Sequence, residues 1–220
     1  MYKILITSLM IAEGIACITG LCSWQKARHS VWKYFIIYLF FIFSSELFGL
    51  LCMNKGWKEI DQLYFTFVVI PAEFIFFYVL FAYHSTSKSY KIFAYLSVLF
   101  YLLSLFIENT GTHRPEFFSI SYTVGNLLLL LLIFMYLYKY LQSDDLIQIR
   151  SNPLIYVSIG LLIFYIGAFP FYGLKNYLWS SYKVIGTNYW YFATILNCLM
   201  YCMFTISFLW GKHKSISSSF

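Results

Sequence analysis

Seven long apolar runs alternate with short polar segments along the chain. The runs cover residues 2–23, 33–53, 62–84, 89–108, 116–140, 152–174 and 187–210. Each is about 20 residues long, the length at which a helix crosses the ~30 Å hydrocarbon core of a bilayer. None has the alternating polar positions of a barrel strand, and lipid offers unpaired backbone groups no partner. The pattern predicts an all-α, polytopic membrane protein: one domain, residues 1–220, folded as a seven-transmembrane-helix bundle.

The composition agrees with this pattern. The chain is 61% hydrophobic and only 11% charged, whereas a soluble domain has about a quarter charged residues. The polar segments are too short for a separate aqueous domain, so we expect the lipid bilayer to be the main partner. The net charge of +6 comes from basic residues dispersed at the ends of the runs, where they anchor helices. With no glycine-rich phosphate loop or basic-aromatic patch, no nucleic-acid partner is expected.

The basic residues also predict the orientation. Nine fall on one side of the predicted bundle and six on the other: Lys26, Arg28, Lys33, Lys88, Lys91, Lys139, Arg150, Lys212 and Lys214 against Lys3, Lys55, Lys58, Arg114, Lys175 and Lys183. Since cytoplasmic loops carry the excess of Lys and Arg, the N-terminus is expected outside and the C-terminus in the cytoplasm. The first run contains Glu13, which favours an uncleaved span over a signal peptide.

Three glutamates stand in the middle of consecutive runs: Glu13, Glu46 and Glu73. A carboxylate at that depth costs a few kcal/mol on insertion scales and ~10 or more in simulations. Counted inward from the outer end of each run, the three lie roughly 12–17 Å deep at ~1.5 Å per residue. That is near the midplane of a ~30 Å core, and no Lys or Arg lies at the same level.

Other polar side chains share this level or its helical faces. Asn126, Tyr165 and Asn197 are at similar depth, and Trp190, Thr194, Asn197 and Tyr201 follow i, i+4, i+7, i+11, which is one helix face. Ser45 is grouped with Glu46. Since lipid cannot satisfy such groups, they are expected to point inward. The candidate ligand-binding or proton-relay residues are Glu13, Glu46, Glu73, Asn126, Tyr165, Asn197, Ser45, Thr194, Trp190 and Tyr201.

Breaks in the helices are expected at prolines. Pro153 suits the first turn of a helix, where its missing N–H is not needed. Pro71 and Pro170 fall inside runs and are expected to kink them.

No catalytic constellation is recognisable, so we expect no enzyme activity, no cofactor and no metal. The histidines, His29, His84, His113 and His213, lie at run ends or in loops, and no pair of aspartates lies in a run core. Cys198 and Cys202 are spaced like metal ligands, but free cysteine commonly behaves as a small buried hydrophobe. The seventh run has no lysine for a retinal Schiff base.

Two functional hypotheses remain, and a structural alternative stands beside them. The layout is similar in topology to the seven-helix input modules of bacterial signalling proteins, which implies a sensory or small-ligand-binding module in the bacterial inner membrane that acts through a partner chain. Its ligand would be small and polar or cationic. The alternative is a proton- or cation-coupled transporter, with the three glutamates as coupling acids. In the structural reading, protonated glutamates join the helices by hydrogen bonds. The apolar inner halves of three runs (74–80, 127–134 and 199–208) favour a sealed inner half, and therefore the sensory module.

Overall fold

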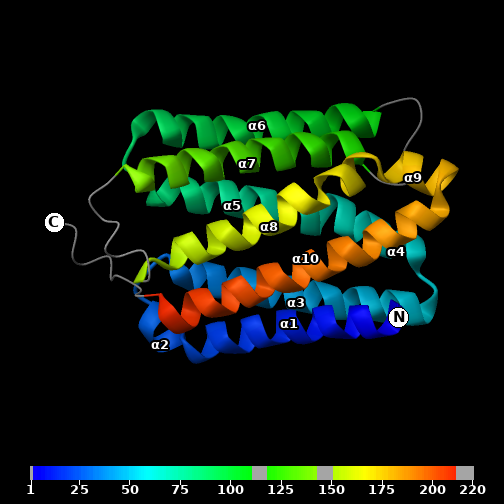
Figure 1. Ribbon diagram of the computed structural model, residues 1–220, viewed down its shortest axis with the longest axis horizontal. Coiled ribbons are helices and arrows are strands. Elements are labelled where there is room, and N and C mark those ends of the chain that lie inside the picture. The colour runs from blue at the N-terminus through cyan, green and yellow to red at the C-terminus, as the bar shows by residue number, and fades with distance from the viewer. Residues whose placement is uncertain (1, 111–117, 143–150, 212–220) are drawn as a thin grey trace.

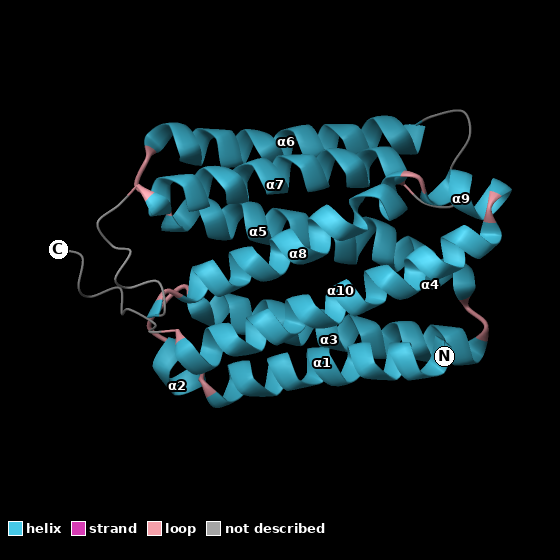
Figure 2. Ribbon diagram, viewed as in Figure 1, coloured by secondary structure: helices cyan, strands magenta, loops and turns pink. Residues whose placement is uncertain are grey.

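The computed structural model describes residues 2–110, 118–142 and 151–211, and these residues form helices joined by short connections, without a strand among them (Figure 2). The helices are α1 Tyr2–Cys22, α2 Trp24–Ala27, α3 Trp32–Lys55, α4 Lys58–Tyr64, η1 Phe65–Val69, α5 Ile70–His84, α6 Lys88–Thr110, α7 Ser119–Leu141, α8 Pro153–Gly173, α9 Lys175–Ser181 and α10 Lys183–Trp210. Residues 116–117 of the fifth predicted run, together with His113, Arg114, Arg150, Lys212, His213 and Lys214, lie outside the described residues.

Seven helical segments of the described chain are long and apolar enough to cross a membrane: α1, α3, the continuous α4–η1–α5, α6, α7, α8 and α10. They correspond to the seven predicted runs, with ends that differ by a few residues. The all-α prediction is therefore confirmed for the described residues.

Six of the seven segments close around the centre of the bundle (Figure 1). Helix α10 packs against α1 and α8, α8 packs against α7, α7 against α5, and α1 against α3. Side chains join α3 to α5, since the rings of Tyr38 and Phe76 stack with centroids 4.3 Å apart. Helix α6 contacts α5 and α7, and it supplies no residue to the central cavity described below.

Local signals explain several helix ends. Gly56 ends α3 with φ +75°, a left-handed conformation that favours glycine, and its N–H returns to the carbonyls of Cys52 and Met53. Asn152 caps α8 by accepting a hydrogen bond from the N–H of Leu154, 3.0 Å away. Pro153 occupies the first turn of α8, as predicted.

The third segment departs from a regular α-helix just before Pro71. Phe65–Val69 forms a π-helical turn, in which the N–H of Ile70 donates to the carbonyl of Phe65 five residues back. Pro71 has no backbone N–H and cannot donate a hydrogen bond to the preceding turn. The π-helical turn changes the backbone hydrogen-bond pattern at this point, and the helix continues through it. Pro170, in contrast, lies inside α8, which continues to Gly173.

Aromatic rings fill the half of the bundle where α3 begins and α10 ends. We call Phe35, Tyr38, Phe77, Phe204 and Phe208 the aromatic plug; all five are buried. Their ring centroids lie 5.2 Å apart for Phe35–Phe204, 5.4 Å for Phe35–Phe208 and 5.2 Å for Tyr38–Phe77. Edge-to-face and stacked pairs at such distances are favourable, so α3, α5 and α10 are tightly joined here.

Candidate ligand-binding cavity

A cavity of about 1220 Å³ occupies the other half of the bundle. Its lining side chains come from every helix except α2 and α6. At one end it is lined by Gln62, Ser180 and Lys183, which are exposed; we call this end the mouth. The mouth lies at the end of the bundle where α1 begins and where α4 and α9 lie, opposite the end where α3 begins and α10 ends (Figure 1). The volume exceeds the ~300–1,000 Å³ usual for small-molecule sites.

Glu13, Glu46 and Glu73 line the inner end of the cavity, and we call them the acid floor. They come from α1, α3 and α5, and each is the polar lining residue of its helix farthest from the mouth. Glu13 is 2% exposed, while Glu46 and Glu73 are half-buried. The carboxyl of Glu13 interacts electrostatically with those of Glu46 and Glu73. The three glutamates therefore line one cavity, and the carboxyl of Glu13 lies within electrostatic range of the other two.

Two of the predicted site residues support the acid floor from behind and do not line the cavity. The Tyr165 hydroxyl donates to Oε1 of Glu73 over 2.8 Å. Asn126 donates through Nδ2 to the carbonyl of Tyr165 over 3.2 Å. Both are fully buried, so the chain Asn126–Tyr165–Glu73 fixes one carboxyl from α7 and α8.

The acid floor also retains hydrogen-bonding capacity. The side chain of Tyr201, which also lines the cavity, lies near the carboxyl of Glu13. Among the described residues, however, Oε2 of Glu13 and Oδ1 of Asn197 are buried without a hydrogen-bond partner. Since buried polar groups are nearly always paired, these acceptors suit a donor brought by a ligand.

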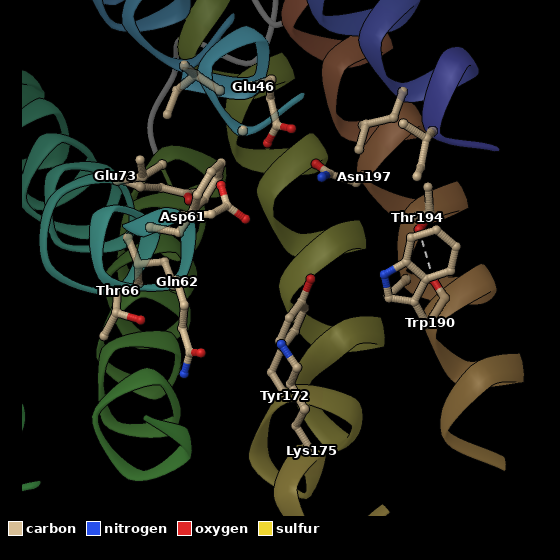
Figure 3. Close-up of a pocket in the computed structure, with 18 of the residues that line it drawn as sticks. Glu46, Asp61, Gln62, Thr66, Glu73, Tyr172, Lys175, Trp190, Thr194 and Asn197 are labelled. Carbon is tan, nitrogen blue, oxygen red and sulfur yellow. Dashed lines mark hydrogen bonds between the residues drawn. The ribbon is translucent and has the colours of Figure 1, made fainter. Parts of the chain in front are cut away.

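The wall contributed by α10 carries the remaining predicted polar residues. Trp190, Thr194, Asn197 and Tyr201 all line the cavity. Thr194 satisfies its own hydroxyl by donating to the carbonyl of Trp190 over 2.9 Å. In Figure 3 the Asn197 amide projects toward the centre, between Glu46 and the indole of Trp190.

Ser45, another predicted site residue, does not line the cavity. Its hydroxyl donates to the carbonyl of Phe41 over 2.9 Å and lies 3.0 Å from the hydroxyl of Tyr64. Neighbouring helix positions point about 100° apart, so Glu46 can face the cavity while Ser45 faces α4.

Several lining residues were not expected from the sequence. Asp61, Gln62 and Thr66 come from the segment before Glu73, and Lys175 and Lys183 come from α9 and the start of α10. The side chain of Asp61 packs so close to α3 that a Cβ at Gly49 would lie 3.2 Å from its Oδ1. Two lysines therefore share the cavity with four carboxyls, although they lie nearer the mouth than the acid floor.

One helical pattern could have identified part of this set. Gln62, Thr66, Val69 and Glu73 have the spacing i, i+4, i+7, i+11 that groups Trp190 with Tyr201. No comparable signal marks Lys175 or Lys183, since lysines at helix ends are ordinary interfacial anchors.

The described residues contain no cluster of three or more His, Cys, Asp or Glu side chains arranged to hold a metal ion. Comparison with protein-family models, with curated proteins and with solved structures found no match.

Proposed function

We propose that this chain is an integral membrane protein that binds a small ligand through a positively charged group and passes the binding event to a partner chain. Its N-terminus and the cavity mouth face outward, and its membrane is the bacterial inner membrane. The observation that carries the proposal is Glu13, an acid with 2% exposure that lines the inner end of a cavity of about 1220 Å³ and keeps one unpartnered carboxyl oxygen.

Electrostatics supports a cationic group. Three carboxyls within interaction range repel one another when they are ionised, and their burial is costly in a membrane. A bound ammonium group offsets both effects and supplies donors to the orphan acceptors. Trp190 and Tyr172 line the same cavity, and ring faces add attraction for a cation.

The aromatic plug supports ligand binding in preference to transport. The cavity lies on one side of it, and Phe35, Phe77 and Phe204 are completely buried. A ligand that enters from the mouth would therefore be held at a closed end. Because the acid floor joins α1, α3 and α5, occupancy would alter how these helices pack, and a partner chain in the membrane could sense the change.

A second candidate is a cation-coupled transporter, and the π-helical turn before Pro71 favours it. Transporters commonly bind substrate where membrane helices are interrupted, and π-turns are frequent at functional sites. Thr66 lies in this turn and lines the cavity. In this alternative, Glu13, Glu46 and Glu73 would act as coupling acids.

Thermal unfolding of the purified protein in detergent tests the proposal. The panel contains ethylammonium, choline, triglycine amide, Na⁺ and K⁺, because a ligand that binds only the folded state raises Tm by mass action. We expect at least one organic cation to raise Tm at a concentration where Na⁺ and K⁺ do not. If none does, the glutamates only join helices and the ligand-binding proposal is wrong.

Flux assays then separate the two candidates. The stabilising cation is loaded into proteoliposomes, and its efflux is followed with and without a pH gradient. A binding module gives efflux equal to that of protein-free liposomes. Saturable efflux above this background would establish the transporter instead.

A further inference from the structure

We propose that the ligand is an elongated zwitterion of about tripeptide length, with its ammonium group on the acid floor and its anionic group at the lysines near the mouth. This inference rests on the proposed function, since it assumes that the acid floor binds the positive end. Beyond that function, it assigns the ligand an anionic group and a distance between this group and the ammonium group.

The cavity separates charge along its length. Three of the four lining carboxyls, those of Glu13, Glu46 and Glu73, line the inner end, whereas Lys175 and Lys183 line the end near the mouth. Lys175 is half-buried, and its Nζ lies 5.7 Å from the ring centroid of Tyr172. Figure 3 shows Lys175 beside Tyr172, on the side away from Glu46 and Asn197. A lysine held in the cavity in this way offers a positive point charge to a carboxylate or phosphate.

Helix α8 gives a measure of the separation. Tyr165 holds Glu73 at the acid floor, and Tyr172, seven residues further along the same helix, lies under the Lys175 ammonium. Seven residues at 1.5 Å each correspond to about 10 Å along the helix. Three residues of extended peptide also span about 10 Å. A single amino acid carries its two charges too close together to reach both ends.

The balance of charge sets the direction of binding. Four carboxyls, including Asp61, and two lysines line the cavity. An ammonium group gains most at the inner end, which three of the four carboxyls line. A carboxylate gains most near the mouth, where the lysines lie. The free energy that the carboxylate loses by desolvation is also smaller there than at the inner end. The ligand would therefore enter with its amino end first.

Glycine oligomers test the inference by calorimetric titration of the full-length protein in detergent. Triglycine carries both charges, triglycine amide lacks the carboxylate, N-acetyltriglycine lacks the ammonium group, and diglycine is shorter. We expect triglycine to bind about tenfold tighter than triglycine amide and diglycine, and N-acetyltriglycine to bind far more weakly than triglycine.

Protein variants assign the second charge to the mouth. Lys175→Gln and Lys183→Gln together are expected to abolish the tenfold preference for triglycine over its amide. Lys58→Gln is the matched control, because Lys58 is an exposed lysine at the same end of the bundle that does not line the cavity. It should keep the preference.

The outcomes separate this inference from the proposed function. Equal affinity for triglycine and its amide overturns the zwitterion inference and leaves the ammonium site intact. Binding of ethylammonium without binding of any glycine oligomer would overturn the zwitterion inference in the same way. If N-acetyltriglycine binds as tightly as triglycine, the acid floor does not bind the amine, and both proposals fail.

Discussion

Replacing Phe77 with alanine tests the packing of the aromatic plug. Phe77 is completely buried, and its ring centroid lies 5.2 Å from that of Tyr38 and 6.0 Å from that of Phe204. The change removes about 100 Å³ of side chain, and at ~24 cal/mol per Å³ of residual cavity the loss is about 2.4 kcal/mol. The transfer contribution is left out because the membrane itself is apolar.

Thermal unfolding in detergent measures this loss. About 2.4 kcal/mol corresponds to a fall in Tm of about 5–10 °C for a chain of this size. Phe100→Ala is the matched control, since Phe100 lies on α6 and is 57% exposed, so its removal should shift Tm by no more than about 1 °C on the same scale. Equal shifts in the two variants would refute a tightly packed plug, and with it the argument for a cavity that is closed at its inner end.

Three further predictions concern packing and the site. Gly125→Ala should destabilise the protein by up to about 2 kcal/mol, because the new Cβ would lie 2.9 Å from the ring of Tyr101 and 3.0 Å from that of Phe74, and overpacking outweighs the helix propensity of alanine. Gly14→Ala should instead stabilise it by about 0.5–1 kcal/mol, since its Cβ meets Phe43 at 3.4 Å; denaturation curves that rank the two the other way would contradict this packing. Affinity for choline, whose charge is independent of pH, should rise between pH 5 and pH 8, because ionised carboxylates attract it and protonated carboxyls do not. Titrations at both pH values check this, and a fall toward pH 8 would exclude carboxylates as the binding groups.

The sequence predicts the helices well, and its prediction that the glutamates share one depth rests on the same local properties. Apolar length fixes where a helix can cross a bilayer, and the 1.5 Å rise fixes the level of Glu13, Glu46 and Glu73. The structure brings these three carboxyls together in one cavity. Equal depth along the three helices is necessary for the glutamates to line one cavity, but it is not sufficient. The packing of α1, α3 and α5 around one centre is also needed.

The remaining site residues depend on tertiary packing that periodicity does not encode. Asn126 and Tyr165 are linked to Glu73 by hydrogen bonds, yet their side chains lie behind the acid floor and outside the cavity lining. Ser45 and Glu46 are adjacent in sequence but face different neighbours. Rotating a helix about its axis by one residue position changes which side chain faces the cavity. The packing of the neighbouring helices determines that rotation.

Lys175 was not predicted to line the cavity, for a different reason. It lies on α9, a seven-residue helix in a connection whose sequence is typical of a polar loop. The fold of that connection brings the lysine over Tyr172, and no hydrophobic period reports it. The charge opposite the acid floor was therefore visible only in three dimensions.

Calorimetric titration with an organic cation tests the central claim most directly. The protein variants are wild type, the triple variant Glu13→Gln, Glu46→Gln, Glu73→Gln, and Glu59→Gln, an exposed acid outside the cavity. The ligand is the cation that raises Tm most in the panel. One unit charge at about 4 Å is worth about 4 kcal/mol at an effective dielectric of 20. Losing the acid floor should therefore weaken binding at least about 100-fold, while Glu59→Gln binds like wild type. Equal affinity in the triple variant and wild type would contradict the account.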